Sequence, residues 1–182
     1  MADALADVSS PALPIRDAVG GDAEAIAAIW NPIIRDTAIT FWPQERSPEE
    51  IARMIAERQA AGWAFLVAGE GGVLGFASFF QFRGGPGYAR CMELTINLAP
   101  EARGRGLGAM LLRALEARAA AFGARVLLGG VTGSNAASLG FHRRMGYTEM
   151  GRIPDAGWKF GQFHELVLMG KRLRDDKASG AG

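Results

Sequence analysis

Apolar residues recur along this chain at two spacings, one typical of helices and one typical of strands. Helical spacing follows Asp22, which can cap a helix, and follows the capping box Ser47-Pro48-Glu49-Glu50, whose helix ends near Gly62. It returns over residues 107–122 and 134–145, where Ser134 can serve as the cap. Strand-like runs are expected at residues 15–18, 63–68, 73–82, 91–99, 125–131, 147–151 and 163–173.

This order of elements predicts an α/β (α+β) layer fold with a mixed sheet flanked by helices. A glycine-rich turn at residues 69–72 indicates a hairpin, and residues 152–161 read as a loop. We expect one domain over residues 14–173, with small, polar and disordered tails at residues 1–13 and 174–182.

Composition narrows the class of protein. The chain has 182 residues, 49% of them hydrophobic, which suits one compact core, and its net charge of +1 argues against a nucleic-acid partner. No apolar run approaches the roughly 20 residues of a membrane helix, and the first residues lack the basic segment of a secretory signal. The single cysteine, Cys91, fits a reducing compartment, so a cytoplasmic location is expected.

The sharpest chemical signal lies between the strand that starts at Cys91 and the helix that follows it. The connection reads Arg103-Gly104-Arg105-Gly106-Leu107-Gly108-Ala109. Glycines let a backbone approach a ligand closely, and the start of a helix presents free N–H groups and positive dipole charge. With two arginines added, the segment is expected to bind an anion, most naturally a diphosphate.

Other interpretations of this loop can be compared with the sequence. Gly104-x-Gly106-x-x-Ala109 matches a loose dinucleotide fingerprint, but the next strand offers no carboxylate for a ribose. No Gly-x-x-x-x-Gly-Lys-Ser/Thr loop is present. A turn without a ligand is the plainest alternative, and two arginines beside three alternate glycines make it improbable.

Other stretches point to one family. They include Ile29-Trp30-Asn31, Gly75-Phe76-Ala77-Ser78, Asn135-Ala136-Ala137-Ser138 and Lys159-Phe160-Gly161. Together with the loop, they make nearly the whole chain resemble the GNAT N-acetyltransferases, especially the phosphinothricin and methionine sulfone acetyltransferase group. The resemblance implies a mostly antiparallel sheet splayed at its central strands, acetyl-CoA as co-substrate, no metal, and a homodimer.

The resemblance also implies a coenzyme site. The backbone N–H of Leu98, or of Asn97 if the register differs, would polarise the thioester carbonyl where the sheet splays. The loop from Arg103 to Ala109 would hold the pyrophosphate, and Asn135 and Ser138 would lie beside the pantetheine arm.

Two residues are candidates for proton transfer. Glu93 lies on the central strand between Met92 and Leu94, where a buried carboxylate is costly without a purpose. The resemblance points Glu93 at the acceptor amine. His142 lies one helical turn after Ser138 and is a candidate catalytic residue, although a histidine with a structural hydrogen bond is the commoner case.

Four residues are predicted to bind the acceptor substrate. Arg83 can hold a carboxylate bidentately, and Thr37, Phe41 and Tyr88 would line the same pocket. The alternatives are a solvated loop arginine and aromatic residues that close the core. Lys159 is expected to pair with Glu165 or a partner subunit and to carry no chemistry.

The sequence departs from the group on the acceptor side, at Leu94, Asn97, His164 and the glycine-rich loop 84–87. These departures leave the coenzyme site intact and concern which amine is accepted. From the resemblance we expect direct acetyl transfer from acetyl-CoA to the amine of a small amino-acid-like substrate, such as methionine sulfone, methionine sulfoximine or phosphinothricin. The alternatives are a dinucleotide-dependent oxidoreductase and a non-catalytic acyl-CoA-binding module.

Overall fold

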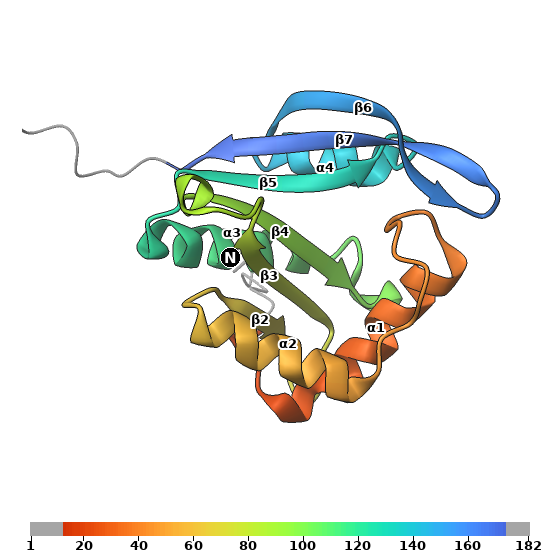
Figure 1. Ribbon diagram of the computed structural model, residues 1–182. Helices are drawn as coiled ribbons and strands as arrows, with labels where there is room; N and C mark the ends of the chain where they lie inside the picture. Colours follow the sequence, from red (N-terminus) through yellow and green to blue (C-terminus); the bar gives the residue numbers. More distant parts are fainter. Residues whose placement is uncertain (1–12, 174–182) are drawn as a thin grey trace, which may run out of the picture.

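The computed structural model describes residues 13–173 (Figure 1). The tails expected at residues 1–13 and 174–182 lie outside this range, apart from Leu13, which packs against the core. None of the described helices has the length and apolar character needed to cross a membrane.

A seven-stranded sheet forms the centre of the fold, in the order β1-β2-β3-β4-β5-β7-β6. Only β4 and β5 pair in parallel, so the predicted mixed, mostly antiparallel sheet is confirmed. The strands are β1 (Ile15–Asp17), β2 (Phe65–Ala68), β3 (Gly75–Gln81), β4 (Cys91–Leu98), β5 (Val126–Thr132), β6 (Thr148–Lys159) and β7 (Gln162–Arg172).

Four α-helices cover the two faces of the sheet (Figure 1). They are α1 (Ala23–Asp36), α2 (Pro48–Ala60), α3 (Leu107–Phe122) and α4 (Ala136–Arg144). On one face, Trp30 of α1 packs on Phe76 of β3, with ring centres 5.0 Å apart. On the other face, Phe122 of α3 packs on Phe79 at 5.8 Å. Alternate residues of β3 and β4 therefore point to different helix layers.

The segment after α4 differs from the prediction. The expected short strand at residues 147–151 and loop at 152–161 are one long strand, β6, paired with β7. Pro154 and the neighbouring polar residues suggested a loop, but β6 is an edge strand, where proline is tolerated. Its register with β7 shifts between Ile153 and Gly157, which accommodates the irregular sequence.

The predicted cap of α1 is also wrong in detail. The carboxylate of Asp22 makes no capping bond to α1. It accepts hydrogen bonds from the Arg16 guanidinium at 2.7 Å and from the Val19 N–H at 2.8 Å. The Ser47 capping box forms as predicted, with reciprocal bonds between Ser47 and Glu50.

Candidate active site

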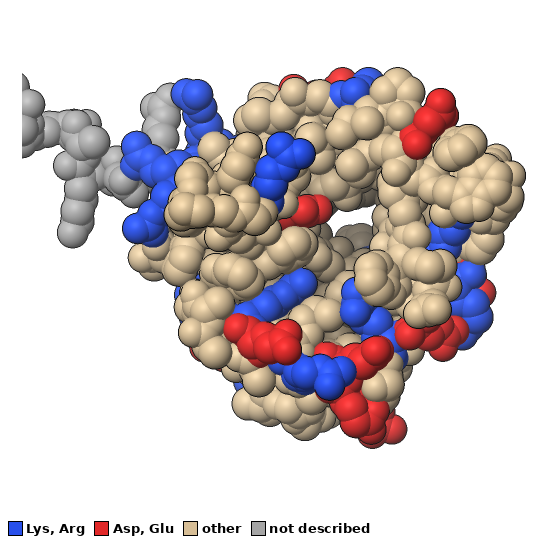
Figure 2. Space-filling model, in the orientation of Figure 1, with Lys and Arg blue, Asp and Glu red and all other residues tan. Residues whose placement is uncertain are grey.

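The sheet opens between β4 and β5. The two strands pair only from Cys91 to Leu94, after which β4 continues along β3 and β5 continues along β7. A cavity of about 310 Å³ lies at this gap, and Figure 2 shows the surface deeply hollowed between the two halves of the molecule. Its lining includes Trp30, residues 39–41, residues 93–97, residues 129–132, Asn135, Ser138, His142 and Leu166.

The direction of the backbone N–H groups along β4 follows from its bonds at both ends. The Phe82 N–H donates to the Cys91 carbonyl at 3.0 Å, and the Ala99 N–H donates to the Leu74 carbonyl at 2.9 Å. Odd-numbered residues of β4 therefore direct their polar backbone groups toward β3. The N–H groups of Ile96 and Leu98 point the other way, into the gap.

This alternation decides between the two predicted oxyanion donors. The Leu98 N–H points into the gap, although Leu98 itself is not part of the cavity lining. The Asn97 N–H faces β3, and Asn97 lines the cavity. Ile96, which the sequence did not suggest, lines the cavity and has an N–H group with the same direction as that of Leu98. Its position two residues before Leu98, with the same orientation in a strand, is the signal that would have found it.

Glu93 lies on the α1–α2 face of the sheet. It pairs with Phe80, whose ring contacts Arg58 of α2. Its Oε1 lies 3.5 Å from where a Cβ on Gly130 would stand, so a glycine there leaves room for the carboxylate. Burial raises the pKa of Glu93, and the charge of Arg58 partly opposes that rise. The carboxylate is thus poised to accept a proton closer to neutral pH than an exposed glutamate.

His142 lies on the opposite face of the sheet, on α4. A Cβ on Gly129 would stand 3.0 Å from His142 Nε2 and 3.7 Å from Leu94, which places both side chains on the face opposite Glu93. His142 Nδ1 is 2.9 Å from the Ser138 carbonyl, and because a carbonyl only accepts, Nδ1 carries the proton.

The other ring nitrogen of His142 is buried and has no hydrogen-bond partner among the described residues. Burial lowers the pKa of His142, although the bond to the Ser138 carbonyl opposes this. The ring is therefore neutral near pH 7, and Nε2 is a hydrogen-bond acceptor beside the cavity. Glu93 and His142, both predicted for proton transfer, are brought to one cavity but from different sides of the sheet.

Asn135, rather than the predicted Ser134, caps α4. Its Oδ1 accepts a hydrogen bond from the Ser138 N–H at 3.1 Å. The Ser138 hydroxyl lies 3.4 Å from His142 Nδ1. Because the Asn135 oxygen is occupied by the cap, its amide NH₂ is the group left to bind a ligand in the cavity.

The predicted anion loop leads from the end of β4 into α3. Gly104 and Gly106 have φ angles of +73° and +82°, a conformation that favours glycine. A Cβ on Gly108 would approach Leu98 to 3.3 Å, so this glycine permits α3 to pack closely on β4. The remaining residues divide into the exposed Arg103 and Arg105, the half-buried Ala109 and the buried Leu107. The loop adjoins the cavity through the end of β4 and is not part of its lining.

The predicted acceptor residues separate into two groups. Phe41 lines the cavity and stacks on His164, with ring centres 5.8 Å apart. Thr37 lies outside the lining, and its hydroxyl donates to the Ile33 carbonyl at 2.6 Å. Arg83 and Tyr88 are exposed, with the guanidinium carbon 5.9 Å from the ring centre, and neither lines the cavity.

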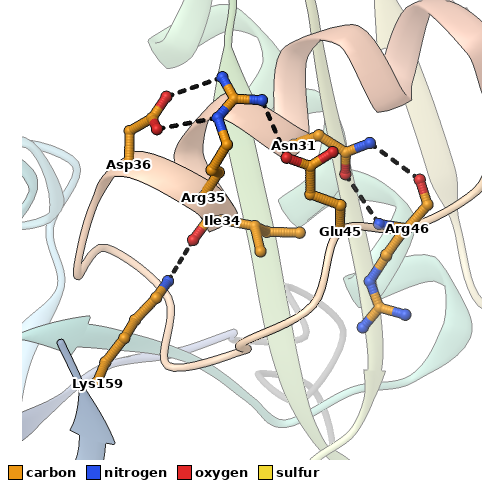
Figure 3. A network of polar contacts seen from close by, with 7 residues as sticks. All are labelled: Asn31, Ile34, Arg35, Asp36, Glu45, Arg46 and Lys159. Atoms are coloured by element: carbon orange, nitrogen blue, oxygen red, sulfur yellow. Dashed lines mark hydrogen bonds and ion pairs between the residues drawn. The ribbon is translucent and has the colours of Figure 1, made fainter. Parts of the chain in front are cut away.

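Lys159 has a structural role that differs from the expected pairing with Glu165. Its ammonium donates to the carbonyl of Ile34 at 2.5 Å (Figure 3) and to that of Thr40 at 2.8 Å. Glu165 pairs instead with Arg152 at 2.8 Å. The buried lysine thereby ties the tip of β6 to the end of α1 and to the loop that carries Phe41. Within residues 13–173, no group of three or more side chains is arranged to hold a metal ion.

The sequence matches known acetyltransferases. The profile described as "Acetyltransferase (GNAT) family" matches residues 28–147. The L-methionine sulfoximine/L-methionine sulfone acetyltransferase of Pseudomonas paraeruginosa is 37% identical over 160 residues, which cover 85% of this chain and 91% of that protein. The phosphinothricin N-acetyltransferase of Streptomyces coelicolor is 30% identical over 157 residues, which cover 84% of this chain and 92% of that protein.

Solved structures show the same fold. A putative acetyltransferase from Salmonella typhimurium, with its cofactor acetyl-CoA, aligns with a TM-score of 0.86 and 32% identity, covering 93% of this chain and 99% of that one. A GNAT superfamily phosphinothricin acetyltransferase from Sinorhizobium meliloti, in complex with acetyl-CoA, aligns with a TM-score of 0.86 and 29% identity, and the alignment covers 94% of each chain. The predicted fold class is thus confirmed.

Proposed function

This chain belongs to the GNAT acetyltransferase family, and on that premise we propose that it acetylates the amine of a small amino acid of the methionine sulfoximine, methionine sulfone or phosphinothricin type. The enzyme is an N-acetyltransferase that uses acetyl-CoA. The observation that supports the reaction is the gap between β4 and β5: the N–H groups of Ile96 and Leu98 point into it, and Ile96 and Glu93, a carboxylate of raised pKa, line its cavity.

The residues on the α3–α4 side fit acetyl-CoA. The positive-φ glycines and the start of α3 suit the pyrophosphate, with Arg103 and Arg105 adding positive charge. Asn135 and Ser138 suit the amide groups of pantetheine, and the unpaired Nε2 of His142 suits an N–H or S–H donor. When bound, acetyl-CoA supplies the activated acetyl group as a thioester.

The proposed reaction is direct attack of the neutral amine on the thioester carbon. The backbone N–H groups of Leu98 and Ile96 donate hydrogen bonds to the developing oxyanion. Glu93 accepts the proton that the amine loses, directly or through a water molecule. The C–N bond forms, the C–S bond breaks, and the coenzyme leaves as a thiolate that takes a proton from solvent, without an acyl-enzyme. His142 acts on the thioester side, because it lies across the sheet from Glu93.

Arg83 and Tyr88 are proposed to guide the acceptor from the β3–β4 loop, outside the cavity, and Thr37 to shape the loop that carries Phe41. The oxidoreductase alternative loses its basis once the family is known. A non-catalytic acyl-CoA-binding module would have little use for a half-buried carboxylate of raised pKa at the gap, which favours an enzyme.

Release of free coenzyme A thiol tests this function. We expect acetyl-CoA turnover that depends on methionine sulfone, methionine sulfoximine or phosphinothricin, across a panel that also contains unmodified amino acids and polyamines. Tight acetyl-CoA binding with no thiol release on any of these amines would contradict the proposed function.

A cytoplasmic homodimer is the proposed assembly. Trp158, Phe160 and Phe163 are 58%, 58% and 61% exposed near the β6–β7 turn, and the rings of Trp158 and Phe163 touch at 4.7 Å. An exposed aromatic cluster of this kind suits a protein interface. Light scattering on the wild type and on Trp158→Ser would test it, because loss of the cluster should favour the monomer.

A further inference from the structure

Two arginines lie near Glu93 on the α1–α2 face of the sheet. Arg46 immediately precedes the Ser47 cap of α2, and Arg58 is on α2 itself. The charges of both Arg46 and Glu93 act on the Arg58 guanidinium. In the described part of the chain, neither arginine has an ion-pair partner within 4.0 Å.

Aromatic rings cover both guanidinium groups. The Arg46 guanidinium carbon is 5.0 Å from the ring centre of Trp30 and 4.6 Å from that of Trp42. The Arg58 guanidinium carbon is 4.6 Å from the ring centre of Phe80. Such contacts fix a guanidinium by its flat faces and leave its N–H edge available for an anion.

Each guanidinium also has an unsatisfied donor. Arg46 Nε and Arg58 Nη1 are buried and have no hydrogen-bond acceptor among the described residues. Buried donors without acceptors are unfavourable, and folded proteins rarely retain them without a function. Two such donors, on neighbouring cations, indicate that a ligand supplies the missing oxygen atoms.

The acidic residues around Arg46 are engaged elsewhere. Arg35 pairs with Asp36 and Glu45, at 2.9 Å each. Asn31 holds the backbone of Arg46 through both amide atoms, at 2.9 and 3.0 Å. Figure 3 shows the Arg46 guanidinium turned away from this network. The carboxylate of Glu50 accepts a hydrogen bond from the Ser47 N–H, within the cap of α2.

Two carboxylates act on these cations, Glu93 on Arg58 and Glu50 on Arg46. Burial, together with the charge of Arg46, lowers the pKa of Arg58 to about 10, so Arg58 remains a cation at neutral pH. Glu93 also lines the cavity, as does Trp30, which contacts Arg46. Neither arginine lines the cavity itself; Arg46 contacts its wall at Trp30, and the charge of Glu93 acts on Arg58.

We infer that Arg46 and Arg58 form an anion-binding subsite that holds an acidic group of the acceptor while its amine lies at Glu93. The acidic group is the α-carboxylate or a phosphinate on the side chain, since both present oxygen atoms to paired N–H donors. This inference rests on the proposed function and adds the residues that would select the acidic group its acceptors carry close to the amine.

Selectivity between acceptors tests the subsite. The ratio of kcat/KM for methionine sulfone to kcat/KM for the same amine without the carboxylate is measured in wild type, Arg46→Gln and Arg58→Gln. We expect the ratio to fall on the order of 10- to 100-fold in each variant, as for the loss of a charged hydrogen bond. A ratio within one enzyme sample does not depend on the fraction of folded protein.

Arg53→Gln is the matched control, because Arg53 is an exposed arginine on the same helix. It should leave the ratio unchanged. Phosphinothricin separates the two sources of charge: if its preference over methionine sulfone also falls, the subsite holds the phosphinate, and if only the carboxylate dependence falls, it holds the carboxylate. Unchanged ratios in both test variants, with an active wild type, would overturn the subsite and leave the proposed function intact.

A binding measurement covers the case in which the wild type acetylates no amine, which would overturn the proposed function alone. N-acetyl methionine sulfone is an anion, and Trp30 and Trp42 lie against Arg46, so its binding should change tryptophan fluorescence. We expect saturable binding that weakens at least 10-fold in Arg58→Gln. Equal binding by the variant, or no binding by the wild type, would contradict the subsite.

Discussion

The two faces of the sheet at the β4–β5 gap differ in the groups they present, backbone groups on one face and charged side chains on the other. The α3–α4 face offers backbone N–H groups, positive-φ glycines at residues 104 and 106, and a capped helix start. The α1–α2 face offers single side chains, Glu93, Arg46 and Arg58, drawn from a strand, a loop and a helix. The proposed coenzyme side thus depends on backbone conformation, and the proposed acceptor side on individual charges.

Removal of the charge at Glu93 should have the largest effect. Glu93→Gln deletes the proposed proton acceptor, so we expect kcat to fall roughly 10²- to 10⁴-fold. In the wild type, activity requires the ionised carboxylate and is lost as pH falls through the pKa of Glu93, which burial raises above 4.5. Rate measurements from pH 4 to 9 should show this limb in the wild type and not in the variant.

The exposed Glu57 on α2 gives a matched control, because Glu57→Gln changes the same group at a residue that does not line the cavity. A Glu93→Gln enzyme with wild-type rate and an unchanged pH limb would remove Glu93 from the mechanism.

On the other face, the single methyl group added by Gly106→Ala should weaken the binding of acetyl-CoA. Gly106 has φ +82°, and no atom lies within 4 Å of where a Cβ would stand, so Gly106→Ala introduces backbone strain without a clash. We expect the KM for acetyl-CoA to rise about 10-fold, from a strain of roughly 1–2 kcal/mol, with little change in acceptor KM.

Gly71 provides the same strain elsewhere. It has φ +71°, open space where its Cβ would stand, and a place in the β2–β3 turn. Gly71→Ala should lower the free energy of unfolding by a similar amount and leave the KM for acetyl-CoA unchanged. Equal effects of the two substitutions on that KM would show that Gly106 contributes only to stability.

The same contrast explains what the sequence could predict. The helix expected at residues 107–122 is observed as Leu107–Phe122, because Gly106 and Gly123 adopt left-handed conformations at its two ends. The coenzyme loop is continuous in sequence, so its motif was recognisable. The long strand β6 was missed because an edge strand tolerates proline and polar residues that normally indicate a loop.

The acceptor side was harder to predict, because its charged groups come from separate elements. Arg58 reads as an ordinary polar position of an amphipathic helix, and only folding brings it against Phe80 of β3. Arg83 was predicted from its place in a loop, but exposure there depends on packing that the sequence does not reveal. Lys159 likewise finds its carbonyl partners 119 and 125 residues away.

His142 should make folding stability depend on pH. Burial holds its folded pKa below 6.5, so the unfolded chain binds more protons just below that pH. The free energy of unfolding should therefore fall as pH decreases below about 6.5, by up to about 1.4 kcal/mol per pH unit from this group. Urea unfolding of wild type and His142→Asn between pH 5 and 8 measures the difference.

The chain has only one other histidine, so His164→Asn is a complete control. The wild-type pH slope should persist in His164→Asn and become shallower in His142→Asn. Equal slopes in the wild type and His142→Asn would contradict a buried, neutral His142.

The smallest effect should come from Arg83, which tests whether the acceptor side extends to the β3–β4 loop. Because Arg83 is exposed, solvent screens its charge, and Arg83→Ala should raise the acceptor KM only about 2- to 5-fold. The increase should shrink at high salt and should be absent in Arg113→Ala, an exposed arginine on α3. Unchanged acceptor kinetics would remove Arg83 from the acceptor side, whereas a loss as large as that expected for Arg58→Gln would place the main anion contact in the loop.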